Sequence, residues 1–227
     1  MSKVRVAAFS ISIDGFGAGP AQDLNNPMGV GGFGLHTWFR GTELFNKMQG
    51  ESGGTRGPDN DVAGQSFENL GAWILGRNMF GPVRGPWQGD SWKGWWGPSP
   101  PYHTPVFVLT HYPRPPLVME GGTTFYFIND GIESALSQAR EAANGKDVRI
   151  DGGVSVIRQY LMAGHVDEMH LAVSPVFLGE GENLFAGINL TKLGFTPYKT
   201  VCGEKATHIF IKRTASKAVM HGSIPLS

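Results

Sequence analysis

Glycines and polar residues gather at the ends of several predicted strands, where each strand gives way to a turn or a helix. In an open parallel sheet, ligands bind beyond the carboxyl ends of the strands. The residue types suit a phosphate group, because glycines let an anion approach the backbone and an arginine can clamp two oxygens. The clusters lie at residues 12–15, 76–78, 110–111 and 151–155. The sequence therefore predicts a ligand site at this edge of a sheet.

Gly152 and Gly153 are the most informative cluster, because they separate a predicted strand from a predicted helix. The start of a helix offers free N–H groups and a partial positive charge to an anion. Ser155 adds a hydroxyl in the first turn, and Val154 begins the apolar stripe of the helix. An ordinary tight turn would use the same pair, so spacing alone leaves phosphate binding and a plain turn as alternatives.

Arg77 follows Gly76 at a second predicted junction between a strand and a helix. The planar guanidinium group can hold two phosphate oxygens at once. Thr110 and His111 end the next strand and could add a hydroxyl and an imidazole beside the same phosphate. A structural role at the surface is the alternative for this arginine.

The elements that position these residues alternate between strand and helix along the chain. Apolar runs predict strands within 3–16, 104–114 and 123–130, a helix over 130–145, and a strand, turn and helix over 147–161. The order predicts an α/β fold, a three-layer sandwich whose mostly parallel central sheet ends in a C-terminal antiparallel hairpin. We expect one domain over residues 1–215 and a loose tail over 216–227.

Two segments between these elements have an unusual composition. Residues 15–65 are rich in glycine and predict a long loop insertion, which either covers a site or is mere decoration. Within it, residues 35–45 form a short amphipathic piece. Residues 87–96 hold four tryptophans, more than a solvated loop should expose, so we expect them to pack on the domain, a partner subunit or a substrate.

The overall composition excludes several classes of function. Lys and Arg total 19, as do Asp and Glu, so the formal net charge is zero. The sequence therefore lacks the excess of basic residues that is typical of proteins that bind nucleic acid or an anionic membrane. No apolar stretch is long enough to span a bilayer, and the start of the sequence lacks the apolar core of a signal peptide. The single cysteine, Cys202, suits a reducing compartment, so we expect a cytoplasmic protein. The seven scattered histidines lack the spacing of a metal site, and we expect no metal.

An ordered set of motifs resembles the dihydrofolate-reductase-like family, and above all the reductase domain of bifunctional riboflavin-biosynthesis deaminase/reductases. The match covers most of residues 3–213, and it is the order of the motifs that makes it specific. These motifs are SISIDGF (10–16), ILGRNMF (74–80), VFVLTHYPR (106–114), RIDGGVSVIRQYL (149–161) and HLAVSPVFLGEGENLF (170–185).

The resemblance implies a dihydrofolate-reductase-like fold and NADPH as the hydride donor. It places Arg77, Thr110 and His111 near the 2′-phosphate, residues 152–155 at the pyrophosphate, and the backbone of Ala8 near the nicotinamide. It also implies a cis peptide bond between Gly152 and Gly153. The chain departs from the family where Met79 replaces a hydroxyl residue and where Val154 replaces the third glycine of some members.

Three residues are candidates for the proton donor of the predicted site. Asp14, at the end of the first strand, is the best-placed acid, although Asp-Gly is also a common turn pair. His36 and Glu43 are the alternatives in the glycine-rich segment. Trp38 and Phe39 could stack on a flat heterocycle or anchor that segment to the core.

We therefore expect an NADPH-dependent oxidoreductase of a small heterocycle, similar to the 5-amino-6-ribosylaminouracil phosphate reductase of riboflavin synthesis. An NADPH-binding protein without turnover and a dihydrofolate reductase proper are the alternatives. The zinc-binding deaminase segment of the bifunctional enzymes is missing, so at most the reductase half is present. We also expect a homodimer, because pairing is common in this family and the tryptophan-rich loop needs cover.

Overall fold

The computed structural model describes residues 2–81, 84–89 and 91–214, and the predicted tail at 216–227 lies outside them. Within these residues one sheet holds nine strands in the order β10-β11-β8-β1-β7-β3-β4-β6-β5. In chain order its members are β1 (Val4–Ile11), β3 (Leu70–Gly76), β4 (Pro105–Leu109), β5 (Leu117–Val118), β6 (Thr124–Ile128), β7 (Asp147–Gly152), β8 (Glu168–Val173), β10 (Phe195–Cys202) and β11 (Thr207–Arg213). A separate pair joins β2 (Phe16–Ala18) to β9 (Glu182–Asn183).

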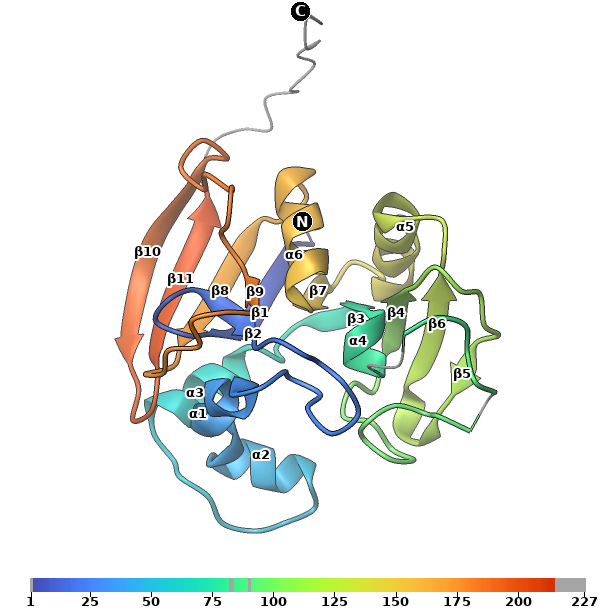
Figure 1. Cartoon of the computed structure of the whole chain (residues 1–227), viewed down its shortest axis with the longest axis horizontal. Helices are drawn as coiled ribbons and strands as arrows, with labels where there is room; N and C mark the ends of the chain where they lie inside the picture. The colour runs from blue at the N-terminus through green and yellow to red at the C-terminus, as the bar shows by residue number, and fades with distance from the viewer. Residues whose placement is uncertain (1, 82–83, 90, 215–227) are drawn as a thin grey trace, which may run out of the picture.

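The central strands are parallel, and antiparallel strands close both edges of the sheet. β1 pairs in parallel with β7 and β8, and β3 pairs in parallel with β4 and β7. The hairpin β10–β11 joins β8 in antiparallel fashion at one edge, and β5 does the same to β6 at the other (Figure 1). The predicted mostly parallel sheet with a C-terminal hairpin is confirmed.

Two layers of helices and loops cover the sheet. Helices α5 (Ile132–Ala143) and α6 (Val154–Met162) bury one face, where Ile74, Phe107 and Ile150 join the main core. On the opposite face, α4 (Arg77–Phe80) and the tryptophan-rich loop cover β3, β4 and β6. Because parallel strands need both faces covered, this arrangement accounts for the apolar runs of the sequence.

The glycine-rich segment 15–65 is more ordered than its composition predicts. It contains the 3₁₀ helix η1 (Gly32–His36) and the helices α1 (Thr37–Arg40), α2 (Glu43–Met48) and α3 (Pro58–Gln65). Trp38 and Ala63 pack from this layer against Ala172 of β8 and Ala206 of the hairpin turn. The segment therefore covers the end of the sheet beside β8 and β11.

The tryptophan-rich loop packs mainly on the domain itself. The Trp92 indole N–H donates to the carbonyl of Phe80 over 2.8 Å, and Trp87 lies edge-on to Phe80 and Phe127. Trp95 rests on Trp92 and stays 38% exposed. Self-packing thus accounts for Trp87 and Trp92 without a partner subunit. The short 3₁₀ helix η2 (Glu120–Gly122) follows this loop.

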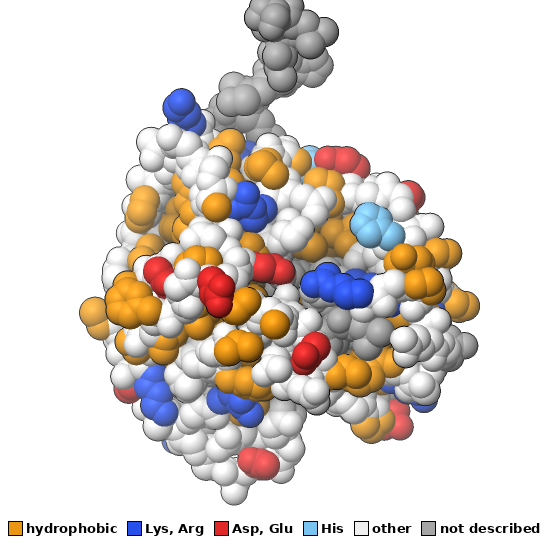
Figure 2. Space-filling model, viewed as in Figure 1, with side chains coloured by type: hydrophobic (Ala, Val, Ile, Leu, Met, Phe, Trp, Pro, Cys, Tyr) orange, Lys and Arg blue, Asp and Glu red, His pale blue; other side chains and the backbone are white. Residues whose placement is uncertain are grey.

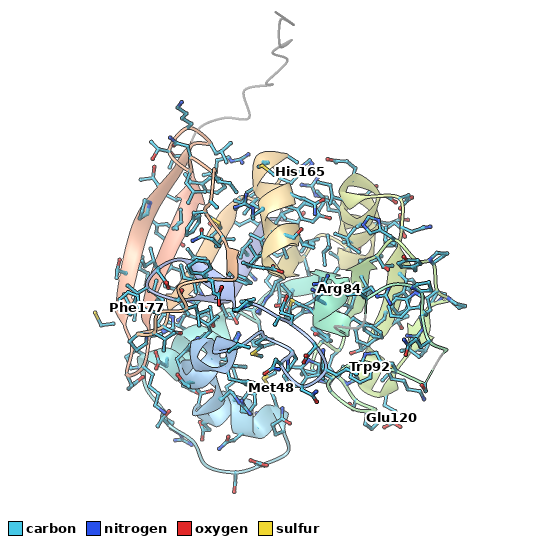
Figure 3. All side chains as sticks on the ribbon, viewed as in Figure 1. Met48, Arg84, Trp92, Glu120, His165 and Phe177 are labelled. Atoms are coloured by element: carbon cyan, nitrogen blue, oxygen red, sulfur yellow. The ribbon has the colours of Figure 1, made fainter. Side chains whose placement is uncertain are left out.

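Large hydrophobic side chains remain exposed at a different place, near the ends of β1 and β8. Ile13 is 52% and Phe177 73% exposed, and the Ile13 N–H donates to the carbonyl of Val176 over 2.9 Å. Figure 3 places Phe177 at the edge where hydrophobic side chains gather in Figure 2. Separately, among the described residues no helix has both the length and the apolar character needed to cross a membrane.

We expect the protein to be a homodimer, because exposed apolar groups of this kind mark surfaces that associate. Sedimentation equilibrium at micromolar concentration should give twice the mass of the chain. Phe177→Ser should weaken the association, whereas Val118→Ser, which changes an equally exposed residue on edge strand β5, should not. A wild-type protein that sediments as a monomer would show this expectation to be wrong.

Candidate functional site

The carboxyl ends of β3 and β7 meet at the start of α6. Gly152 ends β7, Gly153 caps α6, and the peptide bond between them is cis, as the sequence comparison with the family led us to expect. A Cβ atom at Gly76 would lie 2.9 Å from the side chain of Val156 and 3.6 Å from the backbone nitrogen of Gly153. Two of the predicted clusters, 76–78 and 151–155, are therefore brought together.

The start of α6 is open and uncapped. No described side chain caps the helix, and the N–H groups of Val156 and Ile157 both return to the carbonyl of Gly153 at 3.1 Å. The first N–H groups of an α-helix have no partner inside the helix, so those of Val154 and Ser155 remain for a ligand. A Cβ at Gly153 would meet only a Glu182 carboxylate oxygen, 4.0 Å away. The surface beside Gly153 thus has room for an anion.

Gly152 allows the close packing that shapes this junction. Its φ is +128°, a conformation that side-chain-bearing residues rarely adopt, and a Cβ there would lie 2.9 Å from the sulfur of Met79 and 3.0 Å from the ring of Phe9. The Phe9 ring also approaches the place of a Cβ at Gly17 to 2.7 Å. Phe9 of β1 therefore lies between β2 and the cis bond, beside the start of α6.

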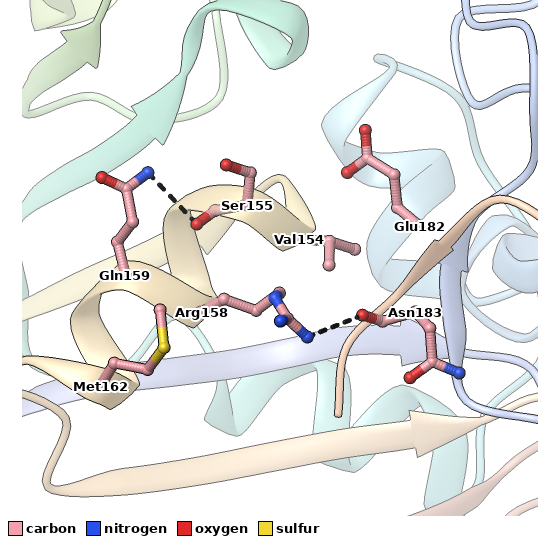
Figure 4. Close-up of a pocket in the computed structure, with 7 residues that line it drawn as sticks. All are labelled: Val154, Ser155, Arg158, Gln159, Met162, Glu182 and Asn183. Atoms are coloured by element: carbon pink, nitrogen blue, oxygen red, sulfur yellow. Dashed lines mark hydrogen bonds between the residues drawn. The ribbon is translucent and has the colours of Figure 1, made fainter. Parts of the chain in front are cut away.

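A cavity of about 300 Å³ lies beside α6 and β9 (Figure 4). The Arg158 guanidinium donates to the carbonyls of Asn183 and Leu184, each over 3.2 Å, and so ties the helix to β9. Ser155 presents its hydroxyl to the same cavity, and Glu182 faces it from the other side. The lining residues are Val154, Ser155, Arg158, Gln159, Met162, Glu182 and Asn183. The sequence had singled out only the first two.

Arg77 lies at the end of β3 with its guanidinium carbon over the ring of Trp87, 3.8 Å from the ring centroid. One terminal nitrogen donates to the carbonyl of Gly85, while Nε is buried without a hydrogen-bond partner among the described residues. Burial lowers the pKa of Arg77, as does the nearby charge of Arg84. A second cavity of about 180 Å³ adjoins this side chain. A guanidinium group beside a cavity is compatible with an anion site.

Thr110 and His111 reach the same region less directly. The Thr110 hydroxyl is buried and bonds within its own turn, accepting from the N–H of Tyr112 over 3.2 Å. His111 is exposed, and the ring of Tyr112 faces Arg77 with 5.3 Å between guanidinium carbon and ring centroid. Tyr112, which sequence reasoning did not single out, thus connects the end of β4 to Arg77.

The model of the RibD C-terminal domain matches residues 3–207. The chain belongs to the RibD C-terminal domain family.

Solved structures show the fold of this RibD C-terminal domain in other proteins. A riboflavin biosynthesis protein from Shewanella sp. PV-4 is 19% identical with a TM-score of 0.56, covering 95% of this chain and all of its own. A diaminohydroxyphosphoribosylaminopyrimidine deaminase/5-amino-6-(5-phosphoribosylamino)uracil reductase from Thermotoga maritima is 12% identical with a TM-score of 0.53, covering 93% of this chain and 56% of its own. The predicted dihydrofolate-reductase-like fold class is confirmed.

A curated relative matches a shorter stretch of the chain. YyaP of Bacillus subtilis (strain 168) is 40% identical over 62 residues, which are 27% of this chain and 32% of YyaP. The match therefore spans about a third of the curated relative.

In this RibD C-terminal domain the Asp14 carboxylate binds backbone N–H groups of the loop that follows β8. Its two carboxylate oxygens accept the N–H groups of Gly179 at 2.7 Å and Leu178 at 3.2 Å. A hydrogen bond with Ser12, followed by these backbone amides, lowers the pKa of Asp14. The geometry favours the turn-forming alternative, and the role of Asp14 as an acid stays a prediction.

The alternative acids and the stacking residues lie in the layer formed by α1–α3. Burial, and to a lesser degree the charge of Arg40, lowers the pKa of His36 to about 4, and Glu43 accepts a hydrogen bond from Arg56 over 2.8 Å. Trp38 is 2% exposed, and Phe39 packs against it with ring centroids 5.6 Å apart. The structure favours anchoring over ligand stacking for Trp38, and it leaves Phe39 half-buried.

Proposed function

We propose that this protein is an NADPH-dependent reductase of a small heterocycle, of the kind that reduces 5-amino-6-ribosylaminouracil phosphate. The observation that carries the proposal is the pairing of two anion sites along one edge of the sheet. One is the start of α6 beside Gly153, which no described side chain caps, and the other is the Arg77 guanidinium, whose Nε has no hydrogen-bond partner in the described part of the chain. A dinucleotide with a pyrophosphate and a 2′-phosphate matches such a pair. We place the protein in the cytoplasm, where its exposed free thiol, Cys202, stays reduced.

Each group of residues has a distinct part in holding the cofactor. Residues 152–155 present backbone N–H groups and the Ser155 hydroxyl to the pyrophosphate, and Gly76 allows β3 to approach that turn. Arg77 binds the 2′-phosphate, with Thr110 and His111 at the neighbouring strand end. The backbone of Ala8 and the ring of Phe9 border the nicotinamide. When bound, NADPH supplies a hydride to the substrate, while these residues orient the ring and exclude water.

Calorimetric titration of the purified protein with NADPH and NADH tests the proposal. We expect NADPH to bind more tightly, with one site per chain. Oxidation of NADPH, followed at its absorbance band with aminopyrimidine and pterin substrates, then tests turnover. The absence of NADPH binding would contradict the proposal.

Binding without turnover is the second candidate function, and the state of Asp14 favours it. The carboxylate is already engaged with Leu178 and Gly179, so it is poorly placed to give a proton to a substrate. A dihydrofolate reductase proper is less favoured, because its acid would have to come from His36, which is neutral at pH 7, or from the ion-paired Glu43.

Asp14→Asn separates an acid role of Asp14 from a turn-forming one. If the carboxylate acts as an acid or orients a water, turnover should fall by roughly 10²-fold, because general acid–base groups contribute about that much. NADPH affinity should be nearly unchanged, since the amide oxygen can still accept a backbone N–H. Steady-state kinetics on an identified substrate, with calorimetry beside it, measures both. If turnover survives intact, the residue is only a turn former.

A further inference from the structure

Strand β1 carries a bulge at its middle. Val6 pairs with Met169 of β8 and Phe9 pairs with Leu171, so Ala7 and Ala8 together stand opposite the single residue His170. Ala8 has a φ of +51°, which is unusual for a residue with a side chain. A bulge leaves the backbone of its extra residue without a ladder partner. Some other group must therefore satisfy the N–H of Ala8.

A chain of buried side chains satisfies this N–H. The Ala8 N–H donates to Nδ1 of His170 over 3.0 Å, Nε2 of His170 lies 3.0 Å from Nδ1 of His208, and Nε2 of His208 lies 2.8 Å from Oδ1 of Asp59. His170, His208 and Asp59 are 6%, 0% and 2% exposed. The other oxygen of Asp59 accepts the N–H of Lys205 over 2.9 Å.

The hydrogen bonds run in one direction only. A backbone N–H can only donate, so Nδ1 of His170 must accept and its proton must sit on Nε2. That proton then points at Nδ1 of His208, whose own proton sits on Nε2 and points at Asp59. Burial, and next the neighbouring His208, lowers the pKa of His170 to about 3, which keeps the ring neutral. Each donor in the chain thus has one acceptor.

The bulge decides which side chains of β1 reach the site. Val4 and Val6, before the bulge, face the core under α5 and α6. Side chains of a regular strand alternate between its two faces, so Ala8 and Ser10 should come next in this core. Because of the extra residue, Phe9 and Ile11 face it instead. Without the extra residue, Phe9 would lie on the opposite face with Trp38 instead of beside Gly152. The ring that borders the cis bond is there because of the bulge.

We propose that Asp59, His208 and His170 form a positioning chain that fixes the β1 bulge, and with it the Ala8 backbone and the Phe9 ring, for binding the cofactor. The inference rests on the proposed function for its ligand. It also explains the layer formed by α1–α3: Asp59 belongs to α3, and Trp38 of α1 packs edge-on to His208 and donates to Ser10 over 2.9 Å. This layer packs against the end of β1 on the face of the sheet opposite α5 and α6.

Two substitutions at His170 test the chain. His170→Phe keeps a flat ring against Phe210, on which the imidazole now stacks at 4.5 Å, but it removes the acceptor. His170→Asn places an amide oxygen near the position of Nδ1 and can accept the Ala8 N–H again. We expect the phenylalanine variant to lose at least tenfold in NADPH affinity and the asparagine variant to recover most of it. His165→Phe, which removes a histidine bonded to Glu133, should bind as wild type does.

Affinity is measured by calorimetry below the unfolding temperature of each variant, so that lost stability is not counted as lost binding. A purely structural role would lower the melting temperatures of both His170 variants and leave the affinity of the folded protein unchanged. That result would overturn the proposal.

A second measurement needs neither a variant nor a cofactor. Nitrogen-15 NMR of the histidine rings in the wild-type protein should show His170 and His208 both neutral, each with its proton on Nε2. A proton on Nδ1 of either ring would overturn the chain even if the protein binds NADPH. Conversely, a wild-type protein that shows these tautomers but binds no NADPH refutes the proposed function and the cofactor role of the chain, while the hydrogen-bonded chain itself stands.

Discussion

Gly153→Val is expected to abolish NADPH binding in a protein that still folds. The backbone of Gly153 has φ −65° and ψ −168°, which valine adopts readily, and apart from its two chain neighbours a Cβ there would meet no atom closer than 4.0 Å. The Cβ of valine is therefore accommodated, but the side chain occupies the surface on which the pyrophosphate would lie. Affinity should fall by at least 100-fold, because the branched side chain excludes the phosphates from the helix start.

The control for this substitution is Gly64→Val on α3. A Cβ at Gly64 meets nothing within 4 Å, so the same change is made in open space outside the site. Calorimetry gives the affinities, and circular dichroism shows whether each variant is folded. A folded Gly153→Val protein that binds NADPH like wild type would remove the start of α6 from the proposed site.

Arg77→Ala is expected to weaken NADPH binding and to leave NADH binding nearly unchanged. A charge-assisted hydrogen bond to phosphate contributes about 1.5–3 kcal/mol, so the loss should be roughly 10- to 150-fold. NADH lacks the 2′-phosphate and serves as the internal control. Titration of both cofactors into wild type and variant measures the ratio of affinities. An equal loss for both cofactors would show that Arg77 does not read the 2′-phosphate.

A second pair of variants separates charge from shape at this position. Arg77→Lys keeps the charge but loses the flat group that stacks on Trp87, so it should retain only part of the preference for NADPH. Arg56→Ala removes an exposed arginine that is paired with Glu43, and it should change neither affinity.

The strand ends could be predicted from the sequence because their signals are local. A glycine pair between an apolar strand and an amphipathic helix indicates the junction at Gly152 and Gly153 directly, and the order of the motifs adds the family. Arg77 was found in the same way, from its neighbours in the chain. What the pattern could not show was the partner of Arg77, since Trp87 is ten residues away across a loop with no regular spacing.

The chain from Asp59 to Ala8 could not be predicted, because its members are far apart in the sequence. His170 and His208 are separated by 38 residues, and Asp59 lies 149 residues before His208. Spacing rules for metal sites left the histidines without a role. One weak signal was available: His170 lies inside a strand between the apolar residues Met169 and Leu171, where a polar side chain needs a buried partner.

The alternatives left open at Asp14 and Trp38 depended on tertiary contacts that no local pattern contains. The Asp-Gly pair predicts a turn, but only the fold shows that the carboxylate also holds residues 178–179. Trp38 could face a ligand or the core on helical spacing alone. Its buried hydrogen bond to Ser10 favours the core, and a substrate contact of Trp38 stays a prediction.

The indole of Trp87 restrains Arg77 without covering the donors that a phosphate would use. The guanidinium carbon lies 3.8 Å from the centroid of this ring, whereas the N–H bonds of a guanidinium point outward in its own plane. A cation–π contact contributes about 0.5–2 kcal/mol, so it favours one position of the side chain before any ligand arrives. Because a side chain that is already ordered loses less entropy on binding, Trp87 preorganises the arginine of the proposed cofactor site.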